Sequence, residues 1–386
     1  MSLLVTVTGP DHPGVTAALM DVLAAHGAVV EDVEQVVVHG RLLLGLVIAG
    51  EGSSAGVESA LLTAASDLGV GVEFEPLDEA EPEARSKHHV VVLGAPLPPA
   101  ALAGVARRLA TCGANIETVR RLSSWPAQSY ELVTSGGDTA RLRTELAAEA
   151  VAQSVDVAVE RGTIYRRAKR LVVMDVDSTL VQGEVIEMLA AEAGCEDEVA
   201  RVTAAAMAGE LDFEQSLRAR VALLKDLPVE AVDRVRASVR LTPGARTLVR
   251  TLKRLGWTVG IVSGGFTAVT DDLRQQLGLD HAVANVLEVV DGRLTGHVVG
   301  DVVDRAAKAA ALRRFAAEEG LLPEQTVAIG DGANDLDMLE AAGLGIAFNA
   351  KPIVRQAVDT ALSVPYLDAV LFLLGISREE VEAADS

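Results

Sequence analysis

Two aspartates at the end of an apolar run are the residues whose type and spacing first suggest chemistry. The segment MDVDSTL spans Met174–Leu180, and Asp175 and Asp177 follow directly on the apolar run Leu171–Met174. In open parallel sheets, ligands bind beyond the carboxyl ends of the strands. Two carboxylates two residues apart can divide a task, because one can attack or bind a metal while the other moves protons. The alternative is structural, since Asp and Ser are also good N-caps of helices.

Two further segments carry groups that suit an anion. IVSGG spans Ile261–Gly265 after another apolar run, where the Ser263 hydroxyl and the Gly264 N–H can donate hydrogen bonds to a phosphate. Lys308 lies near the start of a predicted helix, Arg305–Glu318, where an ammonium can neutralise phosphate charge. Each segment alone has an ordinary alternative, because Ser-Gly-Gly is often a turn and a helix lysine is often only solvated.

The fourth segment, IGDGANDLDML (Ile329–Leu339), follows a further apolar run. Asp331 and Asp335 flank Gly332 and Asn334 in it. Carboxylates on a glycine-containing turn are hard oxygen ligands that suit Mg²⁺. A loop followed by an N-cap is the alternative for this segment alone. Together, the four segments favour phosphate and metal chemistry over four separate structural accidents.

Alternating strands and helices must position these residues. Apolar, β-branched runs separated by helical segments predict a parallel, Rossmann-like α/β sheet that is covered on both faces. The stretch from about 184 to 240 is too long for a simple crossover, which predicts a helical cap inserted over the sheet edge. Asp291-Gly292 lies between two alternating runs and predicts a hairpin. The predicted parallel strands are Leu171–Met174, Thr258–Val262, Thr326–Ile329 and Leu344–Phe348.

The first part of the chain is a duplicated small unit. Its strand and helix signals run in the order βαββαβ, the ferredoxin-like pattern, and this order then repeats. HGAVVEDV (His26–Val33) matches CGANIETV (Cys112–Val119) at the same helix-to-strand junction, which indicates an internal repeat. We therefore expect two small domains at 1–78 and 88–162, a linker at 79–87, and a third domain at 169–376.

Composition narrows the class of partner. The 386 residues carry a formal net charge of −21, which repels nucleic acid and anionic membranes. The sequence has no signal-peptide pattern and no apolar stretch long enough to span a bilayer. Its two cysteines, Cys112 and Cys195, are far apart, which favours a reducing cytoplasm over a disulfide framework or a zinc site. An anionic substrate would need positive charge supplied locally.

The four segments, in this order, resemble the haloacid dehalogenase superfamily of phosphotransferases over about residues 169–376. The resemblance implies that Asp175 is a nucleophile that becomes an aspartyl phosphate. It implies that Asp177 protonates the leaving oxygen and then activates water. Mg²⁺ is implied at the Asp175 carboxylate, the Asp177 backbone carbonyl and Asp331, with support from Asp335. The implied phosphate ligands are Ser263, Gly264 and Lys308, and Asn334 is implied near the hydrolytic water and the substrate.

Within that superfamily, the sequence is most similar to the phosphoserine phosphatases. Their pattern DxDST(L) is followed by a Glu seven residues after the second Asp, here Glu184. The resemblance implies O-phosphoserine as substrate, with Glu184 on its ammonium and an arginine on its carboxylate. The family's cap pattern favours Arg220, with Met207 and Phe213 as apolar lining or as ordinary cap packing. The competing arginines are Arg218, Arg234 and Arg236.

The duplicated unit resembles the ACT domain, a ferredoxin-like module that often binds amino acids and pairs with copies of itself. GPDHPGV (Gly9–Val15) matches its opening loop, so Asp11 and Gly14 are expected at an effector site, with serine as the simplest effector. The second copy departs from the pattern, because GAPLP (Gly94–Pro98) lacks the acidic residue and the glycine. The resemblance also implies a homodimer formed through these units, and a purely dimerising role is the alternative.

Three rival functions remain open at this point. A phosphatase of another small phosphomonoester, such as phosphothreonine or a phosphosugar, would not need Glu184. A non-catalytic amino-acid sensor would be expected to have lost some of the aspartate motifs, and a CheY-like phosphoacceptor would need neither the cap nor Glu184. The family resemblance implies a Mg²⁺-dependent phosphoserine phosphatase that acts at the end of serine biosynthesis, and the cysteine content favours the cytoplasm.

Overall fold

A computed structural model describes residues 2–49, 54–77, 86–163, 166, 168–358 and 360–385. The chain forms two compact units, residues 1–84 and 85–386. Most of the predicted linker at 79–87 lies outside the described residues. No helix in the described ranges combines the length and the apolar character that crossing a membrane requires.

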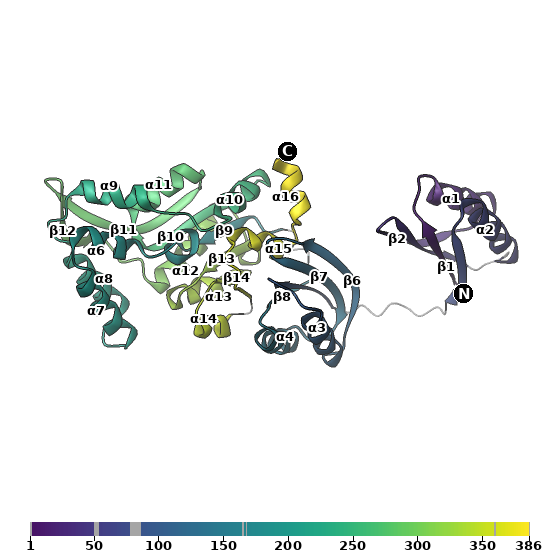
Figure 1. Cartoon of the computed structure of the whole chain (residues 1–386), viewed down its shortest axis with the longest axis horizontal. Coiled ribbons are helices and arrows are strands. Elements are labelled where there is room, and N and C mark those ends of the chain that lie inside the picture. The colour runs from purple at the N-terminus through teal and green to yellow at the C-terminus, as the bar shows by residue number, and fades with distance from the viewer. Residues whose placement is uncertain are drawn as a thin grey trace. The chain divides into compact units, whose positions relative to one another are not determined.

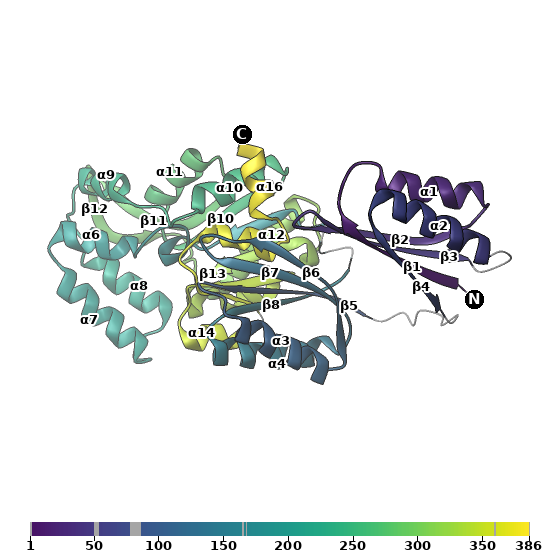
Figure 2. The ribbon, with the colours of Figure 1, turned by 45° about the vertical axis from the view of Figure 1, so that its right-hand side comes forward.

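The first unit has the predicted βαββαβ order. Two helices cover one face of an antiparallel sheet with strand order β2-β3-β1-β4 (Figure 2). Alternate residues of β3, from Leu42 to Ile48, point into the core under the helices, as the two-residue period of a strand requires. The elements are β1 (Ser2–Pro10), α1 (Val15–Ala25), β2 (Val30–Val38), β3 (Arg41–Ala49), α2 (Ser54–Leu68) and β4 (Gly71–Leu77).

The second unit begins with the repeat of this fold. Its sheet has the equivalent strand order β6-β7-β5-β8, and α3 and α4 lie side by side on one face (Figure 1). The elements are β5 (Lys87–Gly94), α3 (Pro99–Thr111), β6 (Ala114–Ser123), β7 (Gln128–Gly136), α4 (Thr139–Gln153) and β8 (Asp156–Arg161).

A seven-stranded sheet forms the rest of the second unit, in the order β12-β11-β10-β9-β13-β14-β15. Strands β10, β11, β13, β14 and β15 run parallel to β9, whereas β12 pairs antiparallel with β11 through the predicted hairpin. The strands are β9 (Leu171–Met174), β10 (Thr258–Phe266), β11 (His281–Val290), β12 (Arg293–Val299), β13 (Thr326–Gly330), β14 (Leu344–Phe348) and β15 (Ala361–Leu362).

The central strand β9 is buried on both faces. Val172 and Met174 belong to one apolar cluster, and Leu171 and Val173 belong to another. A continuous apolar run is what a parallel strand between two helical layers requires, so the predicted covered sheet is confirmed. The helices of this layer arrangement are α10 (Ala245–Arg254), α11 (Thr267–Leu277), α12 (Arg305–Glu318), α13 (Leu336–Ala341) and α14 (Pro352–Ala357), followed by α15 (Val370–Leu373) and α16 (Arg378–Asp385).

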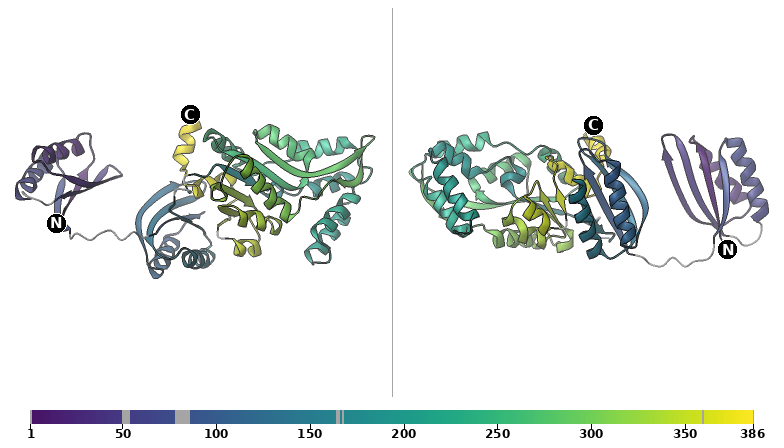
Figure 3. Two further views of the ribbon diagram at one scale, coloured as in Figure 1. Left: turned by 180° about the vertical axis from the view of Figure 1, so that it is seen from behind. Right: turned by 60° about the horizontal axis from the view of Figure 1, so that its bottom comes forward.

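The long insertion between β9 and β10 is helical, as predicted. Four of its helices form a cap beside the carboxyl ends of the strands, at the end of the domain distant from the second small sheet (Figure 3). The chain re-enters the sheet domain beside the place where it left, because Gln182 N–H donates to the Arg240 carbonyl oxygen at 2.8 Å. The cap helices are α6 (Val185–Ala193), α7 (Glu196–Met207), α8 (Phe213–Ala222) and α9 (Val229–Ser238).

The second small sheet packs against the large domain through apolar and polar contacts, since buried residues of β5, β6 and β8 belong to the same apolar cluster as β9 and β13. The Asp156 carboxylate accepts a hydrogen bond from the Ser363 N–H at 2.7 Å, and Glu131 pairs with Arg166 at 2.6 Å. Arg120 donates to the Gly375 carbonyl oxygen at 3.1 Å. These contacts join residues that are far apart in the sequence, and they make the second repeat part of the same compact unit as the large sheet.

Candidate active site

The register of three parallel strands brings the sequence segments to one edge of the sheet. Met174 of β9 lies level with Ile261 of β10 and Ile329 of β13. The Asp175 N–H extends this pairing by donating to the Ile329 carbonyl oxygen at 2.8 Å. Residues that follow these three positions therefore meet at one place, as the strand-end rule predicts.

Asp175 forms a buried ion pair with Lys308. The Lys308 Nζ lies 2.6 Å from Asp175 Oδ1 and 2.7 Å from Asp335 Oδ1. The first turn of α12 holds the lysine in place, because the Asp304 side chain caps that helix by accepting from the Ala307 N–H. Lys308 is fully buried. It is therefore not a solvated helix lysine, which was the alternative for this residue.

Burial and mutual repulsion act on the carboxylates of this cluster. Burial raises the pKa of Asp175, and repulsion from Asp335 raises it further, although Lys308 opposes both effects. Burial also works against the charge of Lys308, but the two carboxylates outweigh it and raise the lysine pKa. Burial, with repulsion from Asp335, raises the pKa of Asp331 to about 6. The cluster thus holds more negative charge than one ammonium compensates.

Three of these carboxylates have the spacing of a cation site. Oxygen atoms of Asp175, Asp331 and Asp335 all lie within 4.8 Å of one another. Thr179 Oγ1 donates to Asp331 at 3.3 Å, and the Gly332 N–H donates to Asp335 at 2.9 Å, so both carboxylates are fixed in direction. The uncompensated charge and the hard oxygen donors fit a divalent cation such as Mg²⁺.

Asp177 lies beside this cluster in the turn Val176–Leu180. One carboxylate oxygen accepts from the Val185 N–H at 2.8 Å, and the other accepts from the Ser263 hydroxyl at 3.0 Å. Burial raises the pKa of Asp177, although these hydrogen bonds oppose the shift. A Cβ at Gly265 would come within 2.7 Å of the Asp177 carboxylate, so that position requires glycine. Ser263 and Asp177 are thus brought together across the two strand ends.

The cap contributes two opposite charges to the same cavity. Glu184 precedes α6 and accepts from the Ser178 hydroxyl at 3.1 Å. Burial, with repulsion from Asp177, raises the pKa of Glu184 to about 7. Burial lowers the pKa of Arg220 on α8, although the acidic neighbours oppose this. Among the described residues, Arg220 donates only to the Ser216 carbonyl oxygen of its own helix, at 3.4 Å.

The structure separates Arg220 from its three competitors. Arg218 pairs with Glu214 at 2.8 Å, Arg234 with Glu192 at 2.6 Å, and Arg236 with Asp233 at 3.0 Å. Arg220 is the one of these four arginines that lines the cavity with the aspartates.

A cavity of about 690 Å³ joins the strand ends to the cap. Ser263, Lys308 and Asp335 are buried outside its lining. The side chain of Met207, predicted as apolar lining, lies outside the described part of the structure, although α7 ends at that residue. The predicted residues that line the cavity are Asp175, Asp177, Glu184, Phe213, Arg220, Gly264, Asp331 and Asn334.

Sequence reasoning missed part of this lining. Lys351, Ile353 and Val354 line the cavity from the segment after β14, and Arg305 lines it from the first turn of α12. The strand-end rule offers a signal for the first three, because β14 ends at the same edge of the sheet as β9 and β13. No motif marked them, so they were passed over.

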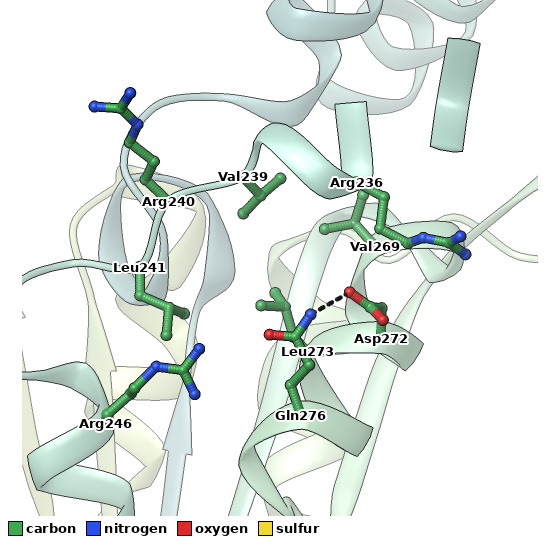
Figure 4. Close-up of a pocket in the computed structure, with 9 residues that line it drawn as sticks. All are labelled: Arg236, Val239, Arg240, Leu241, Arg246, Val269, Asp272, Leu273 and Gln276. Carbon is green, nitrogen blue, oxygen red and sulfur yellow. Dashed lines mark hydrogen bonds between the residues drawn. The ribbon is translucent and has the colours of Figure 1, made fainter. Parts of the chain in front are cut away.

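A second, smaller cavity lies where the cap joins the sheet domain. Its volume is about 280 Å³, and it is lined by α9, the connection that follows it, α10 and α11. Figure 4 shows Arg236 and Arg240 on opposite sides of it, and Asp272 accepting a hydrogen bond from Gln276. Its lining contains none of the clustered carboxylates. We therefore place the chemistry in the larger cavity.

The predicted effector residues belong to the first unit. Asp11 is exposed, and its N–H donates to the Gly40 carbonyl oxygen at 2.9 Å. Gly14 directly precedes α1 and has φ +100°, a conformation that favours glycine. The positive φ is therefore a sufficient reason for glycine at position 14.

Comparisons with known proteins agree with the two resemblances. A model of haloacid dehalogenase-like hydrolases matches residues 172–340, and two ACT domain models match residues 1–75 and 86–160. The predicted fold class, a parallel α/β domain preceded by two ACT-like units, is therefore confirmed.

Relatives match this chain along its whole length. A phosphoserine phosphatase of Streptomyces coelicolor is 58% identical, covering 100% of this chain and 95% of that protein. Phosphoserine phosphatase SerB2 of Mycobacterium tuberculosis is 51% identical, covering 100% and 96%. A solved structure described as a phospho-aspartyl intermediate analogue of phosphoserine phosphatase is 47% identical, with a TM-score of 0.51, and covers 53% of this chain and 98% of its own.

Proposed function

Because this chain belongs to the phosphoserine phosphatases of the haloacid dehalogenase-like hydrolases, we propose that it hydrolyses O-phospho-L-serine through an aspartyl phosphate on Asp175. One observation carries the proposal. The Asp175 carboxylate, held by Lys308, lines the same cavity as the oppositely charged Glu184 and Arg220. A phosphate group and the two charges of an amino acid thus have partners in one place.

The reaction has two steps. A carboxylate oxygen of Asp175 attacks phosphorus, and the bond from phosphorus to the serine oxygen breaks. Asp177 gives its proton to that leaving oxygen, and its raised pKa supports the protonated form that this step needs. Asp177 then accepts a proton from water, whose oxygen attacks the aspartyl phosphate. This second step releases inorganic phosphate and regenerates the Asp175 carboxylate.

A divalent cation fits the carboxylate cluster. Asp175, Asp331 and the Asp177 backbone carbonyl would hold Mg²⁺, with Asp335 supporting Asp331 and Lys308. Bound there, Mg²⁺ supplies positive charge that offsets the repulsion between a phosphate dianion and the attacking carboxylate. Lys308, in contact with Asp175, supplies further positive charge.

Substrate recognition is shared between the two ends of the cavity. Ser263, Gly264 and Lys308 would bind the phosphate, and Asn334 would lie near the hydrolytic water. Glu184 would bind the ammonium and Arg220 the carboxylate, because neither forms an ion pair with another of the described residues. Phe213 and Met207 would provide apolar lining.

Release of inorganic phosphate from a panel of small phosphomonoesters, with and without Mg²⁺, tests this proposal. We expect O-phospho-L-serine to have the highest kcat/KM and chelation of Mg²⁺ to abolish turnover. Faster hydrolysis of phosphothreonine or of a phosphosugar would show that the cap selects a substrate other than phosphoserine. Undiminished turnover after chelation would contradict the metal site.

We further propose that serine binds the first ACT unit and inhibits the enzyme, and that this unit contributes to a homodimer. The exposed edge strand β2 supports dimerisation, because Val33, Val36 and Val38 are 43%, 56% and 49% exposed there. The start of α1 supports an anion contact, because backbone N–H groups at a helix N-terminus suit a carboxylate. We also propose a cytoplasmic location and domains at residues 1–78, 88–162 and 169–376.

Removal of the first unit tests the effector. L-Serine should inhibit the full chain non-competitively with phosphoserine, and a chain that begins at residue 85 should lose that inhibition while it keeps turnover. Asp11→Ala is the sharper point variant, because Gly14→Ala also strains a backbone of φ +100°. Competitive inhibition that persists in the shortened chain would identify ordinary product binding at the active site.

A further inference from the structure

Strand β10 leaves the sheet at the residues that would bind phosphate. It pairs with β11 as far as Val262, opposite Val283, and the next pair is Phe266 with Asn285. Three residues of β10, 263 to 265, therefore stand against one residue of β11, 284. Such a bulge re-aims side chains next to active sites, and it also removes backbone groups from the ladder. The Gly264 carbonyl is one that needs another partner.

The side chain of Asn285 supplies that partner. Its Nδ2 donates to the Gly264 carbonyl oxygen at 2.8 Å, and its Oδ1 accepts from the Val303 N–H at 2.8 Å. Asn285 is only 1% exposed. The two partners require a donor on one side and an acceptor on the other, so they fix the direction of the amide.

These two hydrogen bonds connect different parts of the phosphate site. Gly264 belongs to the loop with the Ser263 hydroxyl. Val303 directly precedes Asp304, which caps α12, and Lys308 lies in the first turn of that helix. One buried amide therefore links the loop that would donate hydrogen bonds to phosphate with the helix start that carries the ammonium.

We propose that Asn285 is a positioning residue for phosphoryl transfer, which holds the Ser263–Gly264 loop and the start of α12 at a fixed separation. The proposal rests on the proposed function. Catalysis of phosphoryl transfer depends almost wholly on positioning and charge stabilisation, and a displacement of about 1 Å can cost about 10²-fold in rate. Burial of an amide also costs stability unless it is hydrogen-bonded, so its presence in a strand of the sheet calls for such a role.

Asn285→Leu tests the proposal, because it keeps the approximate volume and removes both hydrogen bonds. We expect kcat to fall about 10- to 100-fold for phosphoserine and for an aryl phosphate alike, with the ratio of the two unchanged. The affinity for inorganic phosphate, measured by calorimetry with Mg²⁺, should weaken as well. Parallel loss for both substrates distinguishes this role from that of the cap residues.

Leu287→Ala is the matched control, since Leu287 lies two residues along the same strand, is partly buried against the core, and has a side chain that cannot hydrogen-bond to the loop. It should lower the Tm but leave kcat and phosphate affinity close to those of the parent. If Asn285→Leu does not fold, Asn285→Ser applies in the same assays, because one hydroxyl cannot span both partners.

Turnover and phosphate affinity of the Asn285 variant within about threefold of the parent would overturn the proposal. Equal losses of kcat and phosphate affinity in Leu287→Ala would also overturn it. Such losses would show that lower stability of the fold, and not the Asn285 hydrogen bonds, causes the effect. If the parent chain itself released no phosphate from phosphoserine, the proposed function would fail, whereas the calorimetric comparison would still test Asn285.

Discussion

The two ends of the active-site cavity are built differently. At the strand ends, Lys308 and Asp175 are buried and already form an ion pair, and Ser263 already contacts Asp177. At the cap, within the part of the chain that the structure describes, the Glu184 carboxylate accepts only from the Ser178 hydroxyl and the Arg220 guanidinium donates only within its own helix. The phosphate end is therefore arranged before substrate arrives, whereas the cap end holds two charges that an amino acid can complete.

This difference suggests a division of labour. A preorganised site stabilises charge that develops during the reaction without having to rearrange, which suits the chemical step. Charges that are desolvated and incompletely paired gain most from a partner of opposite sign, which suits selection of the substrate. Changes at the strand ends should thus impair every phosphomonoester, and changes at the cap should impair phosphoserine alone.

Asp175→Asn should have the largest effect. The amide keeps the size of the side chain but cannot attack phosphorus, so kcat should fall by about 10⁴-fold or more for phosphoserine and for an aryl phosphate. Circular dichroism should report an unchanged fold. Turnover within about tenfold of the parent would show that Asp175 is not the nucleophile.

Asp177→Asn should have the next largest effect. Loss of the general acid and base should reduce kcat for phosphoserine by about 10²–10⁴-fold. Formation of the aspartyl phosphate from an aryl phosphate should suffer less, because a phenolate leaves without a proton. Pre-steady-state kinetics separates this step from hydrolysis. Equal losses of that first step for both substrates would count against proton transfer by Asp177.

Glu184→Gln and Arg220→Ala should each affect one substrate selectively. Each removes a charge-assisted contact, so kcat/KM should fall about 10- to 100-fold for phosphoserine and little for an aryl phosphate. Arg218→Ala is the control, because Arg218 lies on the same helix but pairs with Glu214 outside the cavity. A parallel decline for both substrates would show that Glu184 and Arg220 support the fold or the metal site instead.

The pH dependence of selectivity should show the smallest effect. Since burial raises the pKa of Glu184 to about 7, this carboxyl is substantially protonated below that pH and cannot pair with an ammonium. The ratio of kcat/KM for phosphoserine to that for an aryl phosphate should therefore rise severalfold, to about tenfold, as pH increases from 6 to 8. Both substrates share the titration of the phosphate group, so the ratio isolates Glu184. A rise of equal size in Glu184→Gln would assign the titration to another group.

The strand-end part of the site was predictable from sequence because short motifs carry it. Apolar runs mark the strands, and polar residues directly after them must meet at one edge of a parallel sheet. The cap was harder, because any of four arginines in it is of the right type to bind a carboxylate. Arg220 was favoured only through family resemblance, and the ion pairs of the other three are visible only in the fold.

Other features depend on contacts that sequence patterns do not encode. Asn285 contacts Gly264 and Val303 only because β10 bulges beside β11. Likewise, the two ACT repeats look alike in sequence, yet the second is joined to the large domain through Asp156 and Ser363, 207 residues apart. A pattern of hydrophobic residues predicts which elements form, but not which polar groups find each other across such distances.

Acid quenching during turnover tests the central claim most directly. The chain would be mixed with O-phospho-L-serine and Mg²⁺, quenched within the first turnover, digested, and analysed by mass spectrometry. We predict one phosphoryl group on Asp175, absent without Mg²⁺ and absent from Asp175→Asn. A phosphoryl group on Asp177 or on another residue, or rapid phosphate release with no phosphorylated peptide under conditions that preserve acyl phosphates, would contradict the account.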